Sequence, residues 1–130
     1  MLAVAAGRAG VTPREQDAVA FAASADADAV GYDRVLLKEI VHHIPQAHAA
    51  SMYAGLAAQL APGGRCVTVT RPQEVEYPLW AAAREVWRAA QPPVQQIEAQ
   101  VAAAGLAVQT HEAVYTATLP KERWFDMVSV

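Results

Sequence analysis

Apolar positions along the chain change their period several times, and these changes predict alternating strands and helices. A continuous apolar run, Val35-Leu36-Leu37, stands inside residues 32–40. Such a run is typical of a strand that is covered on both faces, as in parallel sheets flanked by helices. Residues 65–70 alternate side-chain types and are rich in β-branched residues, which predicts a second strand.

A helix is predicted between these two strands. Within residues 46–60, Met52, Leu56 and Leu60 recur four residues apart and therefore fall on one helical face. The segment Pro62-Gly63-Gly64 is expected to end this helix and to turn the chain into the second strand. A helix between two such strands implies a right-handed parallel crossover, so the pattern predicts one β-α-β unit.

Weaker patterns flank this unit and extend the alternation over the whole chain. Together they favour the α/β class with a mostly parallel sheet, in a single domain over residues 1–130. The further elements expected are helices over 2–9 (ended by Gly10), 18–23, 77–90, 94–104 (ended by Gly105) and from Pro120 onwards, strands over 11–16 and 106–115, and a loop over 24–31.

Composition excludes several classes of function. Apolar residues make up 54% of the chain and charged residues 18%, which is sufficient for a core. The net charge of −3 argues against nucleic acid and anionic membrane as partners, since both need clustered Lys and Arg. No apolar run approaches the roughly 20 residues that cross a bilayer, and we expect a cytoplasmic protein. The single cysteine, Cys66, is interpreted as a small buried apolar residue.

The order of the central motifs resembles a known family. The sequence YDRVLLKEIVHHI carries the first apolar strand and matches the family pattern over Asp33–His43, and LAPGGR, over Leu60–Arg65, leads into the second apolar strand, Cys66–Thr70. In this order they resemble the middle of a class I S-adenosylmethionine-dependent methyltransferase of the small-molecule type. The pair Asp17-Ala18 is similar to the pair that follows the third strand of that family. Ala104-Gly105-Leu106 resembles the entry to its sixth strand, and residues 120–125 resemble a segment that follows that strand in some members.

The resemblance implies a fold and an activity. The fold would be an incomplete Rossmann-like doubly wound sheet, with the family's strands three to six and helices on both faces. The activity would be transfer of a methyl group from S-adenosylmethionine to a small-molecule acceptor. The cofactor's adenine would meet Asp17 and Ala18, and its methionyl end would meet Lys38 and Glu39, largely through the main chain.

Two alternatives concern the same residues. Asp17 can equally cap the helix that begins at Ala18, and its two oxygens allow both roles at once. His43 or His42 is a candidate general base, because imidazole titrates near neutral pH. The alternative for the histidines is that one ring packs in the core while the other meets solvent.

Other polar groups support weaker hypotheses. A metal site from the histidines is disfavoured, because no Cys or Asp completes a ligand set at standard spacing. Residues after the fifth strand and in the last helix could face a substrate, or could belong to solvated helices. The residues concerned are His42, His43, His48 and His111 for the metal, and Glu76, Tyr77, Trp80, Lys121, Arg123 and Trp124 for the substrate.

Departures from the family pattern change the expected behaviour. No glycine-rich strand-to-helix loop precedes Asp17, the first acid in the chain is Glu15, and the last antiparallel strand is absent. In the family's strand order, 3-2-1-4-5-7-6, these losses leave open edges and isolate the third and sixth strands. We therefore expect marginal stability, with a partner chain or a homodimer covering the edges. The alternative function is a non-catalytic docking module. A nicotinamide-dependent dehydrogenase half is disfavoured, since G-x-G-x-x-G is missing.

Overall fold

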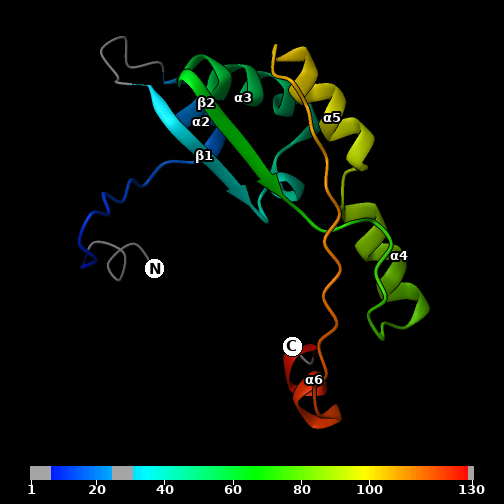
Figure 1. Cartoon of the computed structure of the whole chain (residues 1–130). Helices are drawn as coiled ribbons and strands as arrows, with labels where there is room; N and C mark the ends of the chain where they lie inside the picture. Colours follow the sequence, from blue (N-terminus) through cyan, green and yellow to red (C-terminus); the bar gives the residue numbers. More distant parts are fainter. Residues whose placement is uncertain (1–6, 25–30, 129–130) are drawn as a thin grey trace.

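The computed structural model describes residues 7–24 and 31–128, which combine several helices with a small parallel sheet (Figure 1). The mixture is compatible with the α/β class that the sequence predicts. In chain order the elements are helix α2 (Ala18–Ala23), strand β1 (Tyr32–Lys38), the 3-10 turn η1 (Val41–His43), helix α3 (Gln46–Ala58), strand β2 (Leu60–Val69), and helices α4 (Ala81–Ala90), α5 (Val94–Ala103) and α6 (Lys121–Val128).

The predicted β-α-β unit is confirmed. Strands β1 and β2 pair in parallel, and α3 forms the crossover between them. The position of the turn is corrected, because Pro62-Gly63-Gly64 lies inside β2 rather than before it. The register shifts between the pairs Tyr32↔Leu60 and Arg34↔Arg65, so the pairing of the two strands is irregular there. Gly63 has φ +77°, a left-handed conformation that favours glycine.

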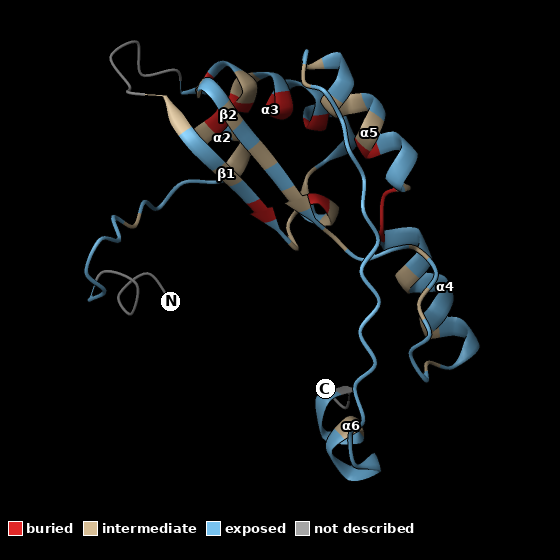
Figure 2. Cartoon of the chain, in the orientation of Figure 1, coloured by how far each residue is buried: buried red, intermediate tan, exposed pale blue. Residues whose placement is uncertain are grey.

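The hydrophobic core forms around α3. Its Met52, Tyr53 and Leu56 are almost completely buried, and the Tyr53 hydroxyl lies 3.1 Å from the Thr68 hydroxyl of β2. Helix α2 packs closely on α3, because Gly55 of α3 has no Cβ that would overlap the carbonyl group of Ala22 in α2. The buried residues that the other elements contribute are Ala22, Leu37, Val41 and Ile97 (Figure 2).

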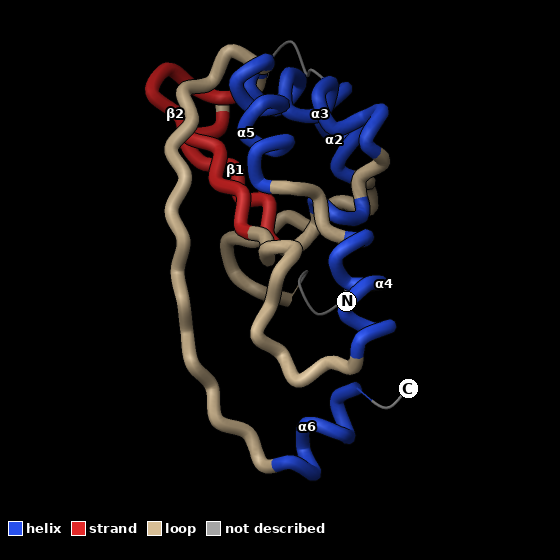
Figure 3. The backbone as a smooth tube through the Cα atoms, turned by 90° about the vertical axis from the view of Figure 1, so that its right-hand side faces the viewer, coloured by secondary structure: helices blue, strands red, loops and turns tan. Residues whose placement is uncertain are grey.

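The helices that pack on the sheet, α2, α3 and α5, lie on the same side of it (Figure 3). The expectation of helices on both faces is therefore wrong for the described residues. Leu36, Val67 and Val69 point to the opposite side, where they are 61%, 44% and 42% exposed. The reason is that all three helices share one core on that side of the sheet.

Two predicted strands are absent from the structure. Residues 11–16 and 106–115 carry strand-like patterns, but the sheet in the described part of the chain contains β1 and β2 alone. Backbone N–H and C=O groups form a ladder only when they pair with a neighbouring strand, and neither segment pairs with one in the sheet. Residues 106–120 instead run as an extended chain from α5 to α6 (orange in Figure 1).

Helix boundaries differ from the predictions by a few residues at most places. Helix α4 begins at Ala81 rather than at Tyr77, and its cap residue Trp80 has extended backbone. Helix α5 ends at Ala103, ahead of Gly105 with φ +81°, as a C-terminal glycine predicts. The first expected helix falls largely outside the described residues. Of that segment, residues 7–10 form turns, and Gly10 has φ +76°.

Candidate functional site

Polar groups gather where β1 and β2 end. Lys38 is the last residue of β1, and the main-chain N–H of Glu39 still donates to the carbonyl oxygen of Val69, at 2.8 Å. Glu39 then takes φ +55°, a left-handed conformation that few residues other than glycine adopt. The backbone therefore leaves the sheet abruptly at Glu39. Both strands are parallel, so this edge carries the carboxyl ends at which α/β sheets place ligands.

An ion pair crosses this edge. Arg71 Nε lies 2.9 Å from Glu39 Oε2, and the Arg71 guanidinium stands over the Trp87 ring at 5.6 Å. The Trp87 indole N–H donates to the carbonyl oxygen of Pro72 at 3.0 Å, which ties α4 to the end of β2. The two charged side chains are 29% and 48% exposed, so the pair contributes little stability and mainly orients the residues.

Sequence reasoning missed Arg71 and Trp87 as parts of this edge. Arg71 stands two residues beyond β2, and its position at a strand end is a signal that points to the same edge as Glu39. Trp87 is half-buried at this edge, whereas Trp80, which was considered as a substrate-facing residue, is 65% exposed.

The two histidines form the short turn η1 directly after this edge. Their rings lie side by side, with centroids 4.0 Å apart and planes at 47°. Val41 is buried beneath them and anchors the turn, while His42 is half-buried and His43 is exposed. The Nδ1 atom of His42 is buried without a hydrogen-bond partner among the described residues. A buried imidazole nitrogen of this kind calls for a partner, such as a water or a ligand.

Asp17 caps helix α2. Its Oδ1 accepts from the main-chain N–H groups of Val19 and Ala20, each at 2.9 Å. The capping role is therefore confirmed, and Oδ2 remains able to accept from another donor. Ala18 packs against the core and offers a ligand only its main chain. Among the described residues no hydrogen bond or ion pair links Asp17 to Lys38 or Glu39, so no direct contact connects the two halves of the predicted cofactor site. The contact of Asp17 with adenine stays a prediction.

An aromatic cluster joins α4, the loop that precedes it and α6. The Tyr77 ring contacts Trp87 at 5.8 Å between centroids and Trp124 at 6.1 Å. The contact with Trp124 joins the loop ahead of α4 to α6, although these segments lie far apart in the sequence. The other residues considered in this region, Glu76, Lys121 and Arg123, are exposed.

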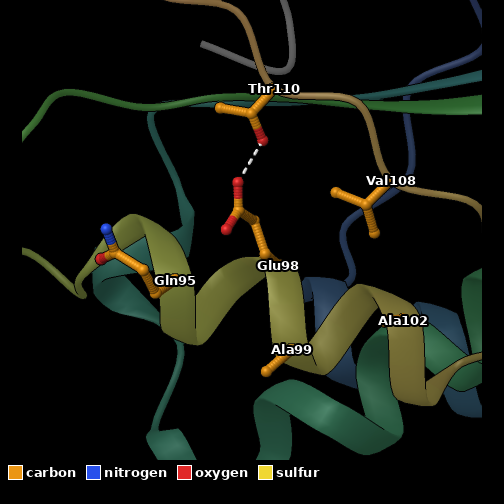
Figure 4. Close-up of a pocket in the computed structure, with 6 residues that line it drawn as sticks. All are labelled: Gln95, Glu98, Ala99, Ala102, Val108 and Thr110. Atoms are coloured by element: carbon orange, nitrogen blue, oxygen red, sulfur yellow. Dashed lines mark hydrogen bonds between the residues drawn. The ribbon is translucent and has the colours of Figure 1, made fainter.

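Two depressions of the described structure lie away from the strand ends. One open depression of about 440 Å³ lies between α5 and the extended chain, where the Thr110 hydroxyl donates to Glu98 (Figure 4). A second, of about 160 Å³, is lined by Cys66 and Thr68 of β2, by α5 and by residues 107–111. Neither includes Lys38, Glu39, His42 or His43. The polar groups at the strand ends therefore belong to neither of these depressions.

No family model, curated protein or solved structure matches the sequence. Among residues 7–24 and 31–128, no group of three or more His, Cys, Asp or Glu side chains could hold a metal ion. No helix in the described ranges is long and apolar enough to cross a membrane.

Proposed function

We propose that this chain is the central and C-terminal part of a class I methyltransferase domain with an incomplete Rossmann-like sheet. The intact domain would transfer a methyl group from S-adenosylmethionine to a small molecule in the cytoplasm. One observation carries the proposal: the two motifs that resemble this family form adjacent parallel strands joined by a helix. Their carboxyl ends bring Lys38, Glu39 and Arg71 to one edge, which is where such folds bind ligands.

The residues present fit part of the cofactor. The left-handed backbone at Glu39 turns the chain away from the sheet. The Glu39 N–H is engaged by the Val69 carbonyl oxygen, so the main-chain groups that would meet the methionyl end are those of Lys38 and the carbonyl oxygen of Glu39. The Glu39 carboxylate itself is held by Arg71, so its contribution would come from the main chain. The free Oδ2 of Asp17 would accept from the adenine amino group. S-adenosylmethionine supplies an activated methyl group, and the protein's task is chiefly to position the acceptor.

The histidines are the candidates for proton transfer. His43 is exposed at the same edge and would accept a proton from an acceptor hydroxyl or amine. His42 lies beside it, with the two ring planes tilted by 47°, and would orient the His43 ring. Both follow β1 by only a few residues, so both would face a ligand bound across the strand ends.

Cofactor binding by this chain alone is expected to be weak, with a dissociation constant in the high micromolar range or above. The strand ends form an open edge, and residues that would hold the ribose have no counterpart in the sequence. The test is an NMR titration of the ¹⁵N-labelled protein with S-adenosylmethionine up to millimolar concentration, with ATP as a matched control that shares the adenosine group. We expect shifts at the amides of residues 38–43 and 17–18.

Two substitutions separate cofactor contact from folding. Asp17→Ser keeps a good helix cap but shortens the side chain, so we expect unchanged thermal stability and smaller shifts at α2. Asp17→Ala removes the cap as well and should cost about 1 kcal/mol of stability. Absence of shifts at residues 38–43, or shifts confined to α5 and residues 107–111, would contradict the proposal. A dissociation constant in the low micromolar range would contradict the expectation that this chain holds only part of the cofactor site.

A further inference from the structure

The side of the sheet that carries no helix has an ordered pattern of side chains. Three pairs of residues face each other across β1 and β2, and all six side chains are exposed. We call this surface the open face. From the start of the strands to their ends, its rows are Arg34 with Arg65, Leu36 with Val67, and Lys38 with Val69.

The charge of the open face opposes that of the whole protein. The chain has a net charge of −3, yet three of these six side chains are cationic and none is acidic. Arg34 and Arg65 are directly opposite, an arrangement of like charges that destabilises a strand pair. In the described part of the chain, neither arginine nor Lys38 forms an ion pair. The Arg34 guanidinium donates instead to the main-chain carbonyl of Asp33, at 2.6 Å.

An apolar row lies between the cationic positions. Leu36 is 61% exposed and Val67 is 44% exposed, and Val69 extends this strip along β2. Parallel sheets are normally covered on both faces, because their strands are apolar on both sides. The open face therefore has no helix packed on it. An element that covers it has to bury the apolar strip and pair with the cations.

We propose that the open face docks an amphipathic helix of a partner protein whose apolar stripe is flanked by carboxylates. A helix is the element that covers a parallel sheet. Carboxylates on it would neutralise the arginine pair and Lys38, and Leu or Val side chains would cover Leu36 and Val67. The arginine pair and the apolar strip lie away from the strand ends. Lys38 stands at the end of β1, where its main chain would meet the cofactor, but only its side chain takes part here, so the inference does not depend on methyl transfer.

The spacing of the rows sets the spacing on the helix. Arg34 and Lys38 are four residues apart along a strand, which is about 13 Å. Two carboxylates seven residues apart on a helix share a face and are separated by about 10 Å. The long side chains of Arg, Lys and Glu span the difference. An apolar residue in the turn between the carboxylates would lie over the Leu36–Val67 row.

Nucleic acid and anionic membrane fit this surface less well. Single-stranded nucleic acid binds to cationic grooves with aromatic side chains for base stacking, and the open face has no aromatic side chain. Membrane surfaces attract clusters of four or more cations, whereas this face has three around an apolar strip. A second copy of this chain would present the same cations, so like charges would meet unless its acidic side chains faced the surface.

The test uses a designed helical peptide as a probe. It carries Glu residues seven positions apart and Leu residues in the turn between them, and its matched control has Lys at each Glu position. Binding to the full chain is measured by fluorescence anisotropy at two salt concentrations. We expect a dissociation constant on the order of tens of micromolar for the Glu peptide, weaker binding at high salt, and no binding of the Lys peptide.

Charge reversal tests where the peptide binds. The double variant Arg34→Glu/Arg65→Glu should weaken binding of the Glu peptide by about tenfold or more and should gain binding of the Lys peptide. Arg84→Glu/Arg123→Glu changes the net charge equally on exposed residues outside the open face, and it should bind as the original chain does. Circular dichroism checks that each variant is folded.

Several results would overturn the proposal. These are equal binding of both peptides, binding of the Glu peptide that the Arg34/Arg65 reversal leaves unchanged, and absence of binding at millimolar peptide. Sedimentation velocity and titrations with oligo(U) RNA and with phosphatidylserine vesicles address other occupants. If the double reversal abolishes self-association, RNA binding or vesicle binding while the Glu peptide does not bind, the open face belongs to that occupant instead.

Discussion

Two regions of this molecule carry equally clear strand patterns, and only one of them forms strands. Residues 32–38 and 60–69 pair in parallel over α3, with Met52 and Leu56 almost completely buried. Residues 106–115 form an unpaired extended chain, in which Val114 and Tyr115 are 84% and 88% exposed. The comparison shows that apolar patterning selects extended backbone, whereas a strand exists only where a neighbour completes the ladder.

The largest expected effect separates the two regions by stability. Leu56→Ala should lower the free energy of unfolding by about 2–5 kcal/mol, because it leaves a cavity in the core around α3. Tyr115→Ala, in the extended chain, should change it by less than about 0.5 kcal/mol. Urea unfolding followed by circular dichroism measures both. A comparable loss for Tyr115→Ala would mean that residues 106–115 pack in solution.

A second substitution tests the close packing of α2 on α3. In an exposed helix position, Gly→Ala stabilises by about 1 kcal/mol. At Gly55 a Cβ would overlap the Ala22 carbonyl group, so Gly55→Ala should destabilise by about 1–3 kcal/mol. The control, Ala54→Gly, measures helix propensity alone at the neighbouring exposed position. A stabilising Gly55→Ala would show that α2 does not lie against α3.

The thiol of β2 reports on the packed region through its pH dependence. Burial raises the pKa of the Cys66 thiol, so the thiolate forms at higher pH in the folded chain than in the unfolded one. The folded state therefore binds the proton more tightly, and stability is lost as pH rises above the ordinary thiol pKa. Iodoacetamide alkylation followed over pH 7–10 should be slower in the native protein than in urea. Equal rates would indicate that β2 opens readily.

The smallest expected effect lies at the α4 side, outside the core. The hydrogen bonds from the Arg88 guanidinium lower the pKa of the Glu74 carboxyl, so the ionised form is favoured in the folded chain. The stabilising contribution is present above the ordinary Glu pKa and disappears as pH falls through the lowered value. Glu74→Gln should remove this part of the acid dependence of stability and leave stability at neutral pH nearly unchanged, because the pair is fully exposed.

Local patterns predicted the parts of the fold that depend on near neighbours in sequence. The four-residue spacing of Met52 and Leu56 predicted α3 and its buried face, and the helix cap that Asp17 forms was one of the two roles considered for it. The position of Lys38 and Glu39 at the end of β1 follows from the same local pattern. Each of these features forms within one turn of helix or one strand, so the sequence carries the information directly.

Features that need a distant partner were decided by the tertiary structure. Residues 106–115 remain extended and unpaired, because no strand of the sheet pairs with them. Arg71 contacts both Glu39 and Trp87, because the fold brings the end of β1, the end of β2 and α4 together. The open face exists because α2, α3 and α5 share one core and leave the other side of the sheet uncovered. Periodicity assigns a side chain to a face of its own element, and only the assembled layers determine what that face meets.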